Sequence, residues 1–514
     1  MTTPTTAQLG SGPAEPREGR RRYAAASVQP IIGGFHPDPS VCRVGRDYYL
    51  VNSSFEYSPG VPVWHSTDLA HWSLIGNALA EGDQFRAGEA GASGGIYAPT
   101  LRHHAGRFWL ITTNVSAGSG QLLTSSVDPA GPWAPAVEIK GLAGIDPDLA
   151  WDDEGTCYVT FCSTQPGLPG IFQAPVDLEN EVILQEPKLV WQGTGLANAE
   201  APHLYRRNGW WYLMIAEGGT ERGHSVSIAR SRNPDGPFEP APSNPIFSHR
   251  STTHPVQNTG HADLVEAPDG EWSVVYLGVR PRGVTPSFHV NGRETFLAGV
   301  DWIDEWPRFV EGRFDFEIPD RSFVDLFAEP SLHPRWISPG APLGNFVSPA
   351  EQGVSLIPAA CASGAVSALA VRVTDERWRL DVALRTAEGA AGVILRLDDR
   401  HWCEIRANNG SARAVLHIGP LEAQVGDTAT DLGQTLTVRI ESVPPTQGGP
   451  DDISISVNRD GRSVSLARFD GRYLSTEVAG GFTGRVAGIR AISGMVEVAS
   501  VRYQADDAYV DVRS

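Results

Sequence analysis

The sequence predicts an all-β protein, a five-bladed β-propeller followed by a β-sandwich. Three observations support this prediction. Glycine and proline are abundant, with 55 Gly and 39 Pro among 514 residues, and such turn formers favour many short strands over long helices. One sequence unit recurs five times in the first three hundred residues. Strand-like alternation of apolar and polar residues then follows without any helical period.

Each repeat opens with a short motif that leads into a first strand, passes through a polar turn and continues into an aromatic-rich second strand. The copies lie about 50 to 60 residues apart and open at Asp38, Ala98, Asp146, Ala201 and His261. The small sheet formed by one such unit cannot bury both of its faces alone. Copies arranged around an axis bury the faces against one another. We therefore expect a propeller over residues 28–318, after a disordered tail over residues 1–27.

A Pro-rich segment from Pro319 to Pro342 separates the repeats from a second domain, expected over residues 322–514. Its strands alternate with a period of two, as in Trp378–Leu384, Leu436–Ile440 and Ile453–Val457. One apolar and one polar face per strand favours a β-sandwich.

The amino-acid composition argues against several classes of protein. The 41 Lys and Arg against 60 Asp and Glu give a net charge of −19, which disfavours nucleic-acid and membrane-surface partners. Five cysteines without zinc spacing indicate neither a disulfide framework nor a structural zinc site. Neither a signal peptide nor a membrane-spanning stretch is found, so a cytoplasmic protein is expected. Homo-oligomerisation stays open.

The repeat register brings ionisable residues together. The first strand of each blade lines the axis of a propeller, so Asp38, Asp146 and His261 should meet at one mouth, with Glu200 one residue before Ala201. Alone, each acid is more often a turn former or a solvated loop residue, and the histidine a core residue. Crowded carboxylates raise one another's pKa, which allows one to stay protonated beside an ionised neighbour. Asp148 competes with Asp146 for the third-blade position, and the alignment with Asp38 favours Asp146.

These motifs resemble glycoside hydrolase family 43. The resemblance is carried by Gly33–Ser40, Tyr48–Glu56, Gly144–Pro147, Glu200–Tyr205, Gly260–Val265 and Gly292–Leu297. It is strongest to β-xylosidase and α-L-arabinofuranosidase members that have a C-terminal β-sandwich. The resemblance therefore implies an inverting, exo-acting enzyme that releases xylose or L-arabinose from pentose-containing hemicellulose oligosaccharides. In such an enzyme the acid and base carboxyls stand about 6.5 to 9.5 Å apart.

The resemblance also implies residue roles. Asp38 would be the general base, Glu200 the general acid and Asp146 the carboxylate that orients and tunes the acid. Arg293 would contact substrate hydroxyls. The residues expected to line the sugar subsite are Phe55 as an aromatic wall, Tyr97 where many members have Trp, and Phe482 on a loop of the second domain.

His261 matches an axial histidine that lies next to a calcium ion or a water in many members of the family. No cofactor is expected to be required, and a structural calcium held through water by His261 is the one metal considered. Two alternatives stay open at this point: a non-catalytic carbohydrate-binding propeller, and a retaining fructosidase-like enzyme. The Asn-Asp-Pro-Asn-Gly and Arg-Asp-Pro motifs of the latter are absent.

Overall fold

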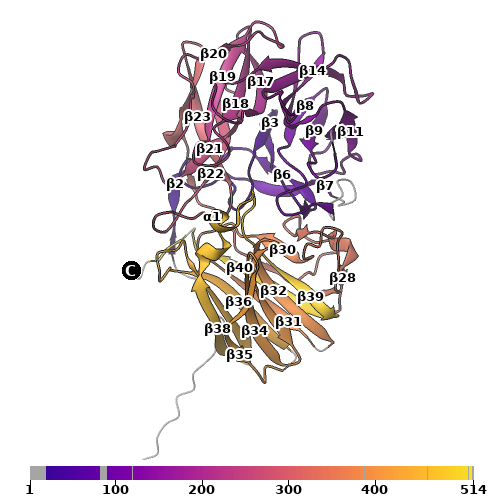
Figure 1. Ribbon diagram of the computed structural model, residues 1–514, viewed down its shortest axis with the longest axis vertical. Coiled ribbons are helices and arrows are strands. Elements are labelled where there is room, and N and C mark those ends of the chain that lie inside the picture. Colours follow the sequence, from indigo (N-terminus) through magenta and orange to yellow (C-terminus); the bar gives the residue numbers. More distant parts are fainter. Residues whose placement is uncertain are drawn as a thin grey trace, which may run out of the picture.

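A computed structural model describes residues 19–80, 89–118, 120–386, 388–433, 435–459, 461–507 and 509–511. The described chain is almost entirely β-structure, in two bodies stacked along the long axis (Figure 1). Residues to about 318 form the upper body, and the later residues form the lower one. Among the described residues, no helix has the length and apolar character needed to cross a bilayer.

The upper body is a five-bladed β-propeller, as predicted. Each blade is an antiparallel sheet of consecutive strands. Blades 1 and 2 comprise β3 (Ser40–Val44), β4 (Asp47–Val51), β6 (Gly60–Ser66) and β7 (Ser73–Leu79), then β8 (Thr100–His104), β9 (Arg107–Thr113), β10 (Gly120–Ser126) and β11 (Val137–Lys140). Blade 3 comprises β12 (Gly144–Trp151), β13 (Cys157–Ser163) and β14 (Ile171–Asp177), with β15 (Val182–Ile183) and β16 (Lys188–Trp191) both paired with β14.

The last two blades close the ring. They comprise β17 (Glu200–Arg207), β18 (Trp210–Glu217), β19 (Ser225–Ser231) and β20 (Glu239–Pro240), then β21 (Gln257–Glu266), β22 (Trp272–Val279), β23 (Glu294–Ile303) and β24 (Trp306–Val310). The first strand of each blade contacts the first strand of the next, and β21 returns to β3. The repeats identified in the sequence therefore correspond to the blades, and their opening residues lie at the axis.

The lower body is a β-sandwich of two antiparallel sheets. The larger sheet has the order β28 (Val347–Pro349), β29 (Val354–Leu356), β40 (Val496–Ala505), β31 (Trp378–Arg385), β36 (Thr435–Val443), β37 (Asp452–Arg459) and β38 (Arg462–Asp470), with β26 (Phe323–Asp325) beside β40. The smaller sheet has the order β30 (Leu369–Arg372), β39 (Val486–Gly494), β32 (Gly389–Asp398), β33 (His401–Asn408), β34 (Ser411–Ile418) and β35 (Leu421–Ala429). Three strands predicted from alternation, β31, β36 and β37, are adjacent, and the apolar residues of β31 alternate into one core.

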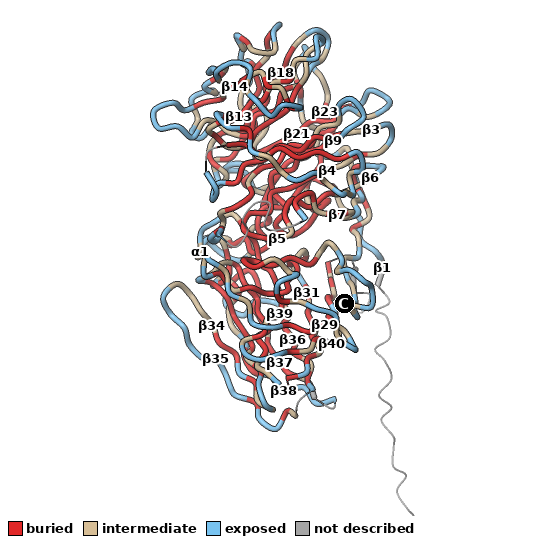
Figure 2. Tube along the Cα trace, turned by 90° about the vertical axis from the view of Figure 1, so that its right-hand side faces the viewer, coloured by how far each residue is buried: buried red, intermediate tan, exposed pale blue. Residues whose placement is uncertain are grey.

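The two bodies share buried surface, and buried residues continue across their junction (Figure 2). β5 (Tyr57–Ser58) of the propeller pairs with β27 (Ser338–Pro339) of the second body. Arg396 on β32 is buried and bonds the Glu56 carboxylate at 3.2 Å. The short elements η4 (Leu343–Asn345), η5 (Gly471–Leu474) and α1 (Thr476–Ala479) complete the second body, and α1 lies at the junction (Figure 1).

The N-terminal segment differs from the expectation of disorder over residues 1–27. β1 (Gly19–Arg21) pairs with β41 (Tyr509–Asp511), and β2 (Tyr23–Ala25) pairs with β25 (Asp315–Glu317). Residues 1–18 lie outside the described part of the chain. The expectation was therefore wrong for residues 19–25. Each short strand is ordered by backbone pairing with a partner about 300 residues or more away, which local composition does not reveal.

Candidate active site

Four blades place a residue with left-handed backbone in their innermost strand or just before it. The φ angles are 55° at Asp38, 55° at Asp146, 52° at Ala201 and 44° at His261. In blades 3, 4 and 5 the pairing register shifts at these residues. Bulges of this kind redirect a side chain and are common beside active sites. In this protein the bulges lie at the residues that open the sequence repeats.

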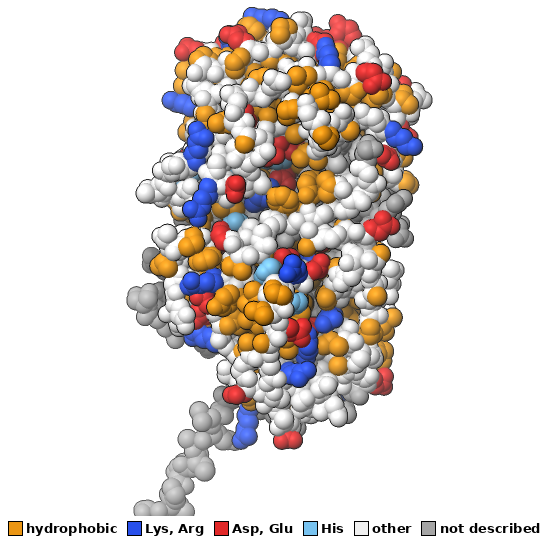
Figure 3. Space-filling model, viewed as in Figure 1, with side chains coloured by type: hydrophobic (Ala, Val, Ile, Leu, Met, Phe, Trp, Pro, Cys, Tyr) orange, Lys and Arg blue, Asp and Glu red, His pale blue; other side chains and the backbone are white. Residues whose placement is uncertain are grey.

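All the residues predicted from the sequence line one pocket at the propeller axis. The lining set comprises Asp38, Phe55, Tyr97, Asp146, Glu200, His261, Arg293 and Phe482, with Ala98, Ile145 and Thr220. A wider cavity of about 810 Å³ adjoins it and shares Glu200, Thr220, Arg293 and Phe482. The space-filling view shows a hollow with acidic side chains in the propeller half of this face (Figure 3). The site is thus a small inner pocket that opens into a larger outer one.

Asp38 is the carboxylate held in its ionised form. Arg293 donates to Asp38 Oδ1 at 3.0 Å, and the Ser53 hydroxyl donates to Oδ2. Although burial alone favours the neutral acid, the Arg293 charge and the Ser53 hydrogen bond hold the pKa of Asp38 below its usual value. His261 Nδ1 lies 3.4 Å away, but burial lowers the pKa of His261 to about 3. At neutral pH Arg293 is therefore the cation that acts on Asp38.

The pKa values of Glu200 and Asp146, in contrast, are raised. Burial, together with the charge of Asp38, raises the pKa of Glu200 to about 7, against the opposing effect of Arg293. Burial and the neighbouring Glu200 and Asp38 carboxylates raise the pKa of Asp146, which accepts a hydrogen bond from the Ala201 amide at 3.1 Å. Carboxylates this close favour retention of a proton. The pocket therefore holds a proton donor beside the ionised Asp38.

Asp148 takes a different role from Asp146. It is fully buried, bonds Arg102 at 2.7 Å and accepts from the Leu204 amide at 2.8 Å. It does not line the pocket. The alignment of the blades therefore identified the correct acid: Asp146 lines the pocket, and Asp148 is buried in an ion pair with Arg102.

Aromatic rings form one wall of the pocket, and one ring comes from the second body. Phe482 stacks on Phe55, with centroids 6.1 Å apart, and meets Tyr97 edge-on at 5.8 Å. The Phe482 amide donates to Ser93 Oγ at 2.9 Å. This bond anchors the loop that carries Phe482 to the segment that leads into blade 2. The Arg293 guanidinium lies 5.3 Å from the Phe482 ring centroid. The sandwich therefore contributes directly to the pocket.

Thr220 is a pocket residue that sequence reasoning missed. Its hydroxyl accepts a hydrogen bond from Arg293 at 2.9 Å, so it helps to orient the guanidinium towards Asp38. Thr220 lies between Gly219 and Glu221 in the connection from β18 to β19, away from any repeat motif. The adjacent Gly218–Gly219 pair, both with positive φ, signals a tight turn and is the only local hint.

A structural calcium ion held through water by His261 stays a prediction, and the carboxylates near His261 are bound by an arginine. Calcium takes six to eight oxygen ligands. The nearby channel carboxylates, Asp148 and Asp263, instead bind the Arg102 guanidinium at 2.7 and 2.8 Å, and His203 Nδ1 lies 3.1 Å from the same group. The Arg102 guanidinium therefore neutralises these two carboxylates.

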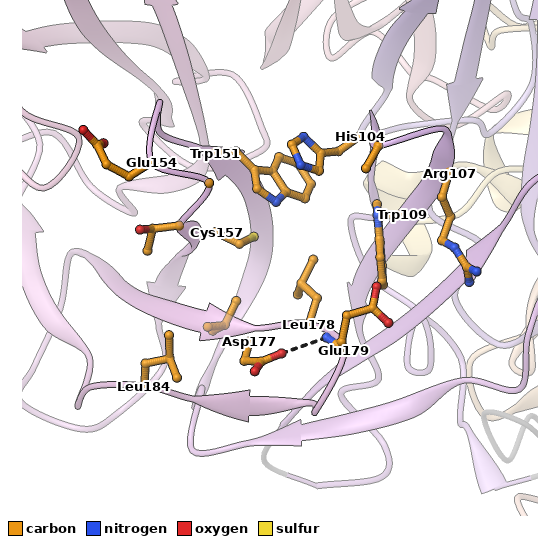
Figure 4. Close-up of a pocket in the computed structure, with 14 residues that line it drawn as sticks. His104, Arg107, Trp109, Trp151, Glu154, Cys157, Asp177, Leu178, Glu179 and Leu184 are labelled. Carbon is orange, nitrogen blue, oxygen red and sulfur yellow. Dashed lines mark hydrogen bonds between the residues drawn. The ribbon is translucent and has the colours of Figure 1, made fainter.

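A separate hollow lies between blades 2 and 3. His104 stacks on Trp151 there at 4.3 Å, and Arg107, Trp109, Glu154 and Glu179 surround the space (Figure 4). None of the candidate catalytic residues lines this hollow.

A five-bladed propeller that holds an ionised Asp and a Glu with a raised pKa in one axial pocket has the groups that a glycoside hydrolase needs. A family model for glycosyl hydrolases family 43 matches residues 27–307, and a model for the β-xylosidase C-terminal concanavalin A-like domain matches residues 324–505. The chain belongs to glycosyl hydrolase family 43.

Relatives match over most of the chain. A xylosidase/arabinosidase of Butyrivibrio fibrisolvens is 34% identical, covering 90% of this chain and 95% of its own length. A non-reducing end α-L-arabinofuranosidase of Bacteroides ovatus is 36% identical, covering 90% of both chains. The crystal structure of a xylan β-1,4-xylosidase from Bacillus halodurans aligns with a TM-score of 0.82 at 26% identity, covering 92% of this chain and 99% of that one.

Proposed function

We propose that the protein is an inverting, exo-acting glycoside hydrolase that releases terminal xylose or L-arabinose from short oligosaccharides. The main support for the proposal is that one pocket holds two carboxyl groups whose pKa values are shifted in opposite directions. The pKa of Asp38 is lowered, and that of Glu200 is raised to about 7. The names of the relatives support a pentose substrate.

In the proposed reaction, Glu200 gives its proton to the leaving glycosidic oxygen. Ionised Asp38 takes a proton from a water that attacks the opposite face of the sugar, and no covalent intermediate forms. Asp146, whose own pKa is raised by burial and by the Glu200 and Asp38 carboxylates, orients the Glu200 carboxyl beside it. Arg293, fixed by Thr220 and Asp38, presents its remaining donors to sugar hydroxyls.

The exo mode follows from the shape of the pocket. Phe482, Phe55 and Tyr97 close one side of the inner pocket, and the wider cavity beyond Glu200 and Arg293 provides room for the rest of the oligosaccharide. A pocket with one closed end admits a chain terminus and excludes a continuous chain.

The test compares initial rates on nitrophenyl β-xyloside, nitrophenyl α-L-arabinofuranoside and hexoside controls, combined with proton NMR of the first sugar formed. The proposal expects turnover of one or both pentosides and inversion at the anomeric carbon. Retained configuration would contradict the single-displacement mechanism. Binding of pentosides without turnover would identify a carbohydrate-binding propeller instead.

A further inference from the structure

A second cluster of ligating side chains lies where the connection after β20 meets η3 (Glu311–Arg313). His249 Nε2 lies 2.8 Å from Glu311 Oε1, and His254 Nε2 lies 3.8 Å from the same oxygen. The three ligand atoms all lie within 4.8 Å of one another. None of the three residues lines the axial pocket or the cavity beside it. The cluster is therefore separate from the proposed catalytic machinery.

The backbone orients both imidazole rings. His249 Nδ1 lies 2.8 Å from the Val256 carbonyl oxygen, and His254 Nδ1 lies 3.1 Å from the same oxygen. A carbonyl oxygen only accepts, so a ring that donates Nδ1–H to it leaves its Nε2 lone pair free. The Val256 amide also lies 3.2 Å from His254 Nδ1, so the tautomer is fixed more firmly at His249. An Nδ1–H bonded to a backbone carbonyl is the usual support of a metal-binding histidine.

The cluster contains unsatisfied buried atoms. His249 is 5% exposed, and both its Nε2 and Glu311 Oε1 lack a hydrogen-bond partner among the described residues, although they are only 2.8 Å apart. Their alignment therefore does not suit a hydrogen bond. A buried imidazole lone pair 2.8 Å from a carboxylate oxygen is unfavourable unless a proton or a metal ion bound by both groups satisfies them. This observation points to a ligand independently of the residue types.

We propose that His249, His254 and Glu311 bind one Zn²⁺ ion, with water completing the coordination. Two imidazoles and a carboxylate suit zinc, whereas calcium and magnesium prefer oxygen ligands. His254 and Glu311 are partly exposed, so the site has room for the water and for entry of the ion.

The ion would have a structural role. His249 and His254 belong to the connection between blades 4 and 5, and Glu311 follows the last strand of blade 5. The Ser27 hydroxyl donates to the Glu311 carbonyl oxygen at 3.0 Å, and the Ala26 amide donates to the Phe314 carbonyl oxygen at 2.9 Å. Zinc would therefore fasten the interblade connection to the place where the N-terminal segment meets the end of the propeller.

The experiment uses the full-length protein without an affinity tag, after treatment with a chelator and dialysis. Titration calorimetry with ZnCl₂ should give one equivalent, and Zn²⁺ at 100 times its dissociation constant should raise Tm by about 2–3 °C. Co²⁺ should give the visible d–d absorption of a protein-bound ion. CaCl₂ should produce neither effect. These readouts do not depend on glycosidase activity, so they stand apart from the proposed function.

Two variants and a control complete the test. His254→Gln and Glu311→Gln should each weaken Zn²⁺ binding at least about 100-fold while leaving turnover at 25 °C unchanged. The control is His71→Gln, since His71 pairs with Asp68 on the surface without a third ligand. It should bind zinc as the unmodified protein does. Absence of stoichiometric binding by the unmodified protein, or equal binding by a folded His254→Gln or Glu311→Gln variant, would overturn the proposal.

Discussion

At the residue scale, the proposed reaction depends on one carboxylate being ionised. Asp38→Ala should lower the rate on every glycoside by about 10² to 10⁴-fold, because no leaving group, however good, replaces activation of the water. Initial rates on nitrophenyl and dinitrophenyl pentosides measure this. The matched control is Asp177→Ala, a half-buried acid on β14 that lies outside the axial pocket. A rate for Asp38→Ala within tenfold of the unmodified protein would remove Asp38 from the role of base.

The pH dependence of kcat/KM follows from the two pKa shifts. Asp38 must be ionised, so activity rises with pH through a pKa below the usual value for Asp. Glu200 must be protonated, so activity falls as pH rises through about 7. A pH–rate profile should therefore show a plateau on the acid side of neutrality and a loss above it. Asp146→Asn should shift the alkaline limb, since the Asp146 and Glu200 carboxyls interact electrostatically in the pocket.

Glu200 can be tested through the leaving group. With an alkyl or sugar leaving group, Glu200→Ala should lower the rate about 10²-fold or more, because the departing oxygen needs a proton. With dinitrophenolate the loss should be much smaller, and the alkaline limb of the pH profile should disappear. Steady-state rates on both kinds of substrate make the comparison. Equal losses on the two substrates would argue that Glu200 is not the acid.

At the scale of elements, Arg102 on β8 ties the inner strands together. Its guanidinium bonds Asp148 of β12 and Asp263 of β21, and it also reaches Ser40 of β3 at 3.1 Å. These partners lie two residues after Asp146, His261 and Asp38, so the same side chain steadies several strands that present the pocket residues. The Arg102 charge also holds the pKa of Asp263 well below its usual range, although burial opposes this.

Arg102→Met should therefore be strongly destabilising. It would leave two fully buried carboxylates without a counter-charge, and removal of one partner of a buried ion pair lowers the free energy of unfolding by about 3–5 kcal/mol. Urea unfolding measures the change. Arg107→Met is the control, since Arg107 is exposed at the start of the next strand, and its effect should stay within about 0.5 kcal/mol. A similar stability for Arg102→Met and Arg107→Met would contradict the structural role.

The sequence predicted the elements that carry a repeated or alternating pattern. The repeat openings at Asp38, Asp146 and His261 identified the inner strands, and alternation from Trp378 identified β31. Arg102 was missed because a charged residue in a strand usually indicates a solvent-facing position, and its partners come from other blades. Thr220 was missed because its place depends on a loop between two glycines. The order of strands in the sandwich depends on distant pairings, such as β31 with β40, which no local pattern encodes.

At the scale of the whole molecule, the pocket is completed by a residue from the second body. Phe482→Ala should lower kcat/KM about 3- to 10-fold, the usual worth of an aromatic contact, mainly through a higher KM. Steady-state kinetics on the preferred pentoside, with Tm as a check on folding, measure this. The control is Val478→Ala, an exposed substitution in the neighbouring α1. Unchanged kinetics for Phe482→Ala would show that the loop does not contact the substrate.

The two bodies should also depend on each other for folding. Phe35, Phe55 and Tyr57 of the propeller share a buried apolar cluster with Ile337, Ala370 and Val486 of the sandwich. Removal of residues 322–514 would uncover these rings together with the Glu56 carboxylate that Arg396 neutralises. We expect the resulting fragment to be insoluble or inactive, because an exposed apolar patch of this kind promotes aggregation. Size-exclusion chromatography and initial rates would test this, and a soluble fragment with unchanged kinetics would show that the propeller is an independent enzyme.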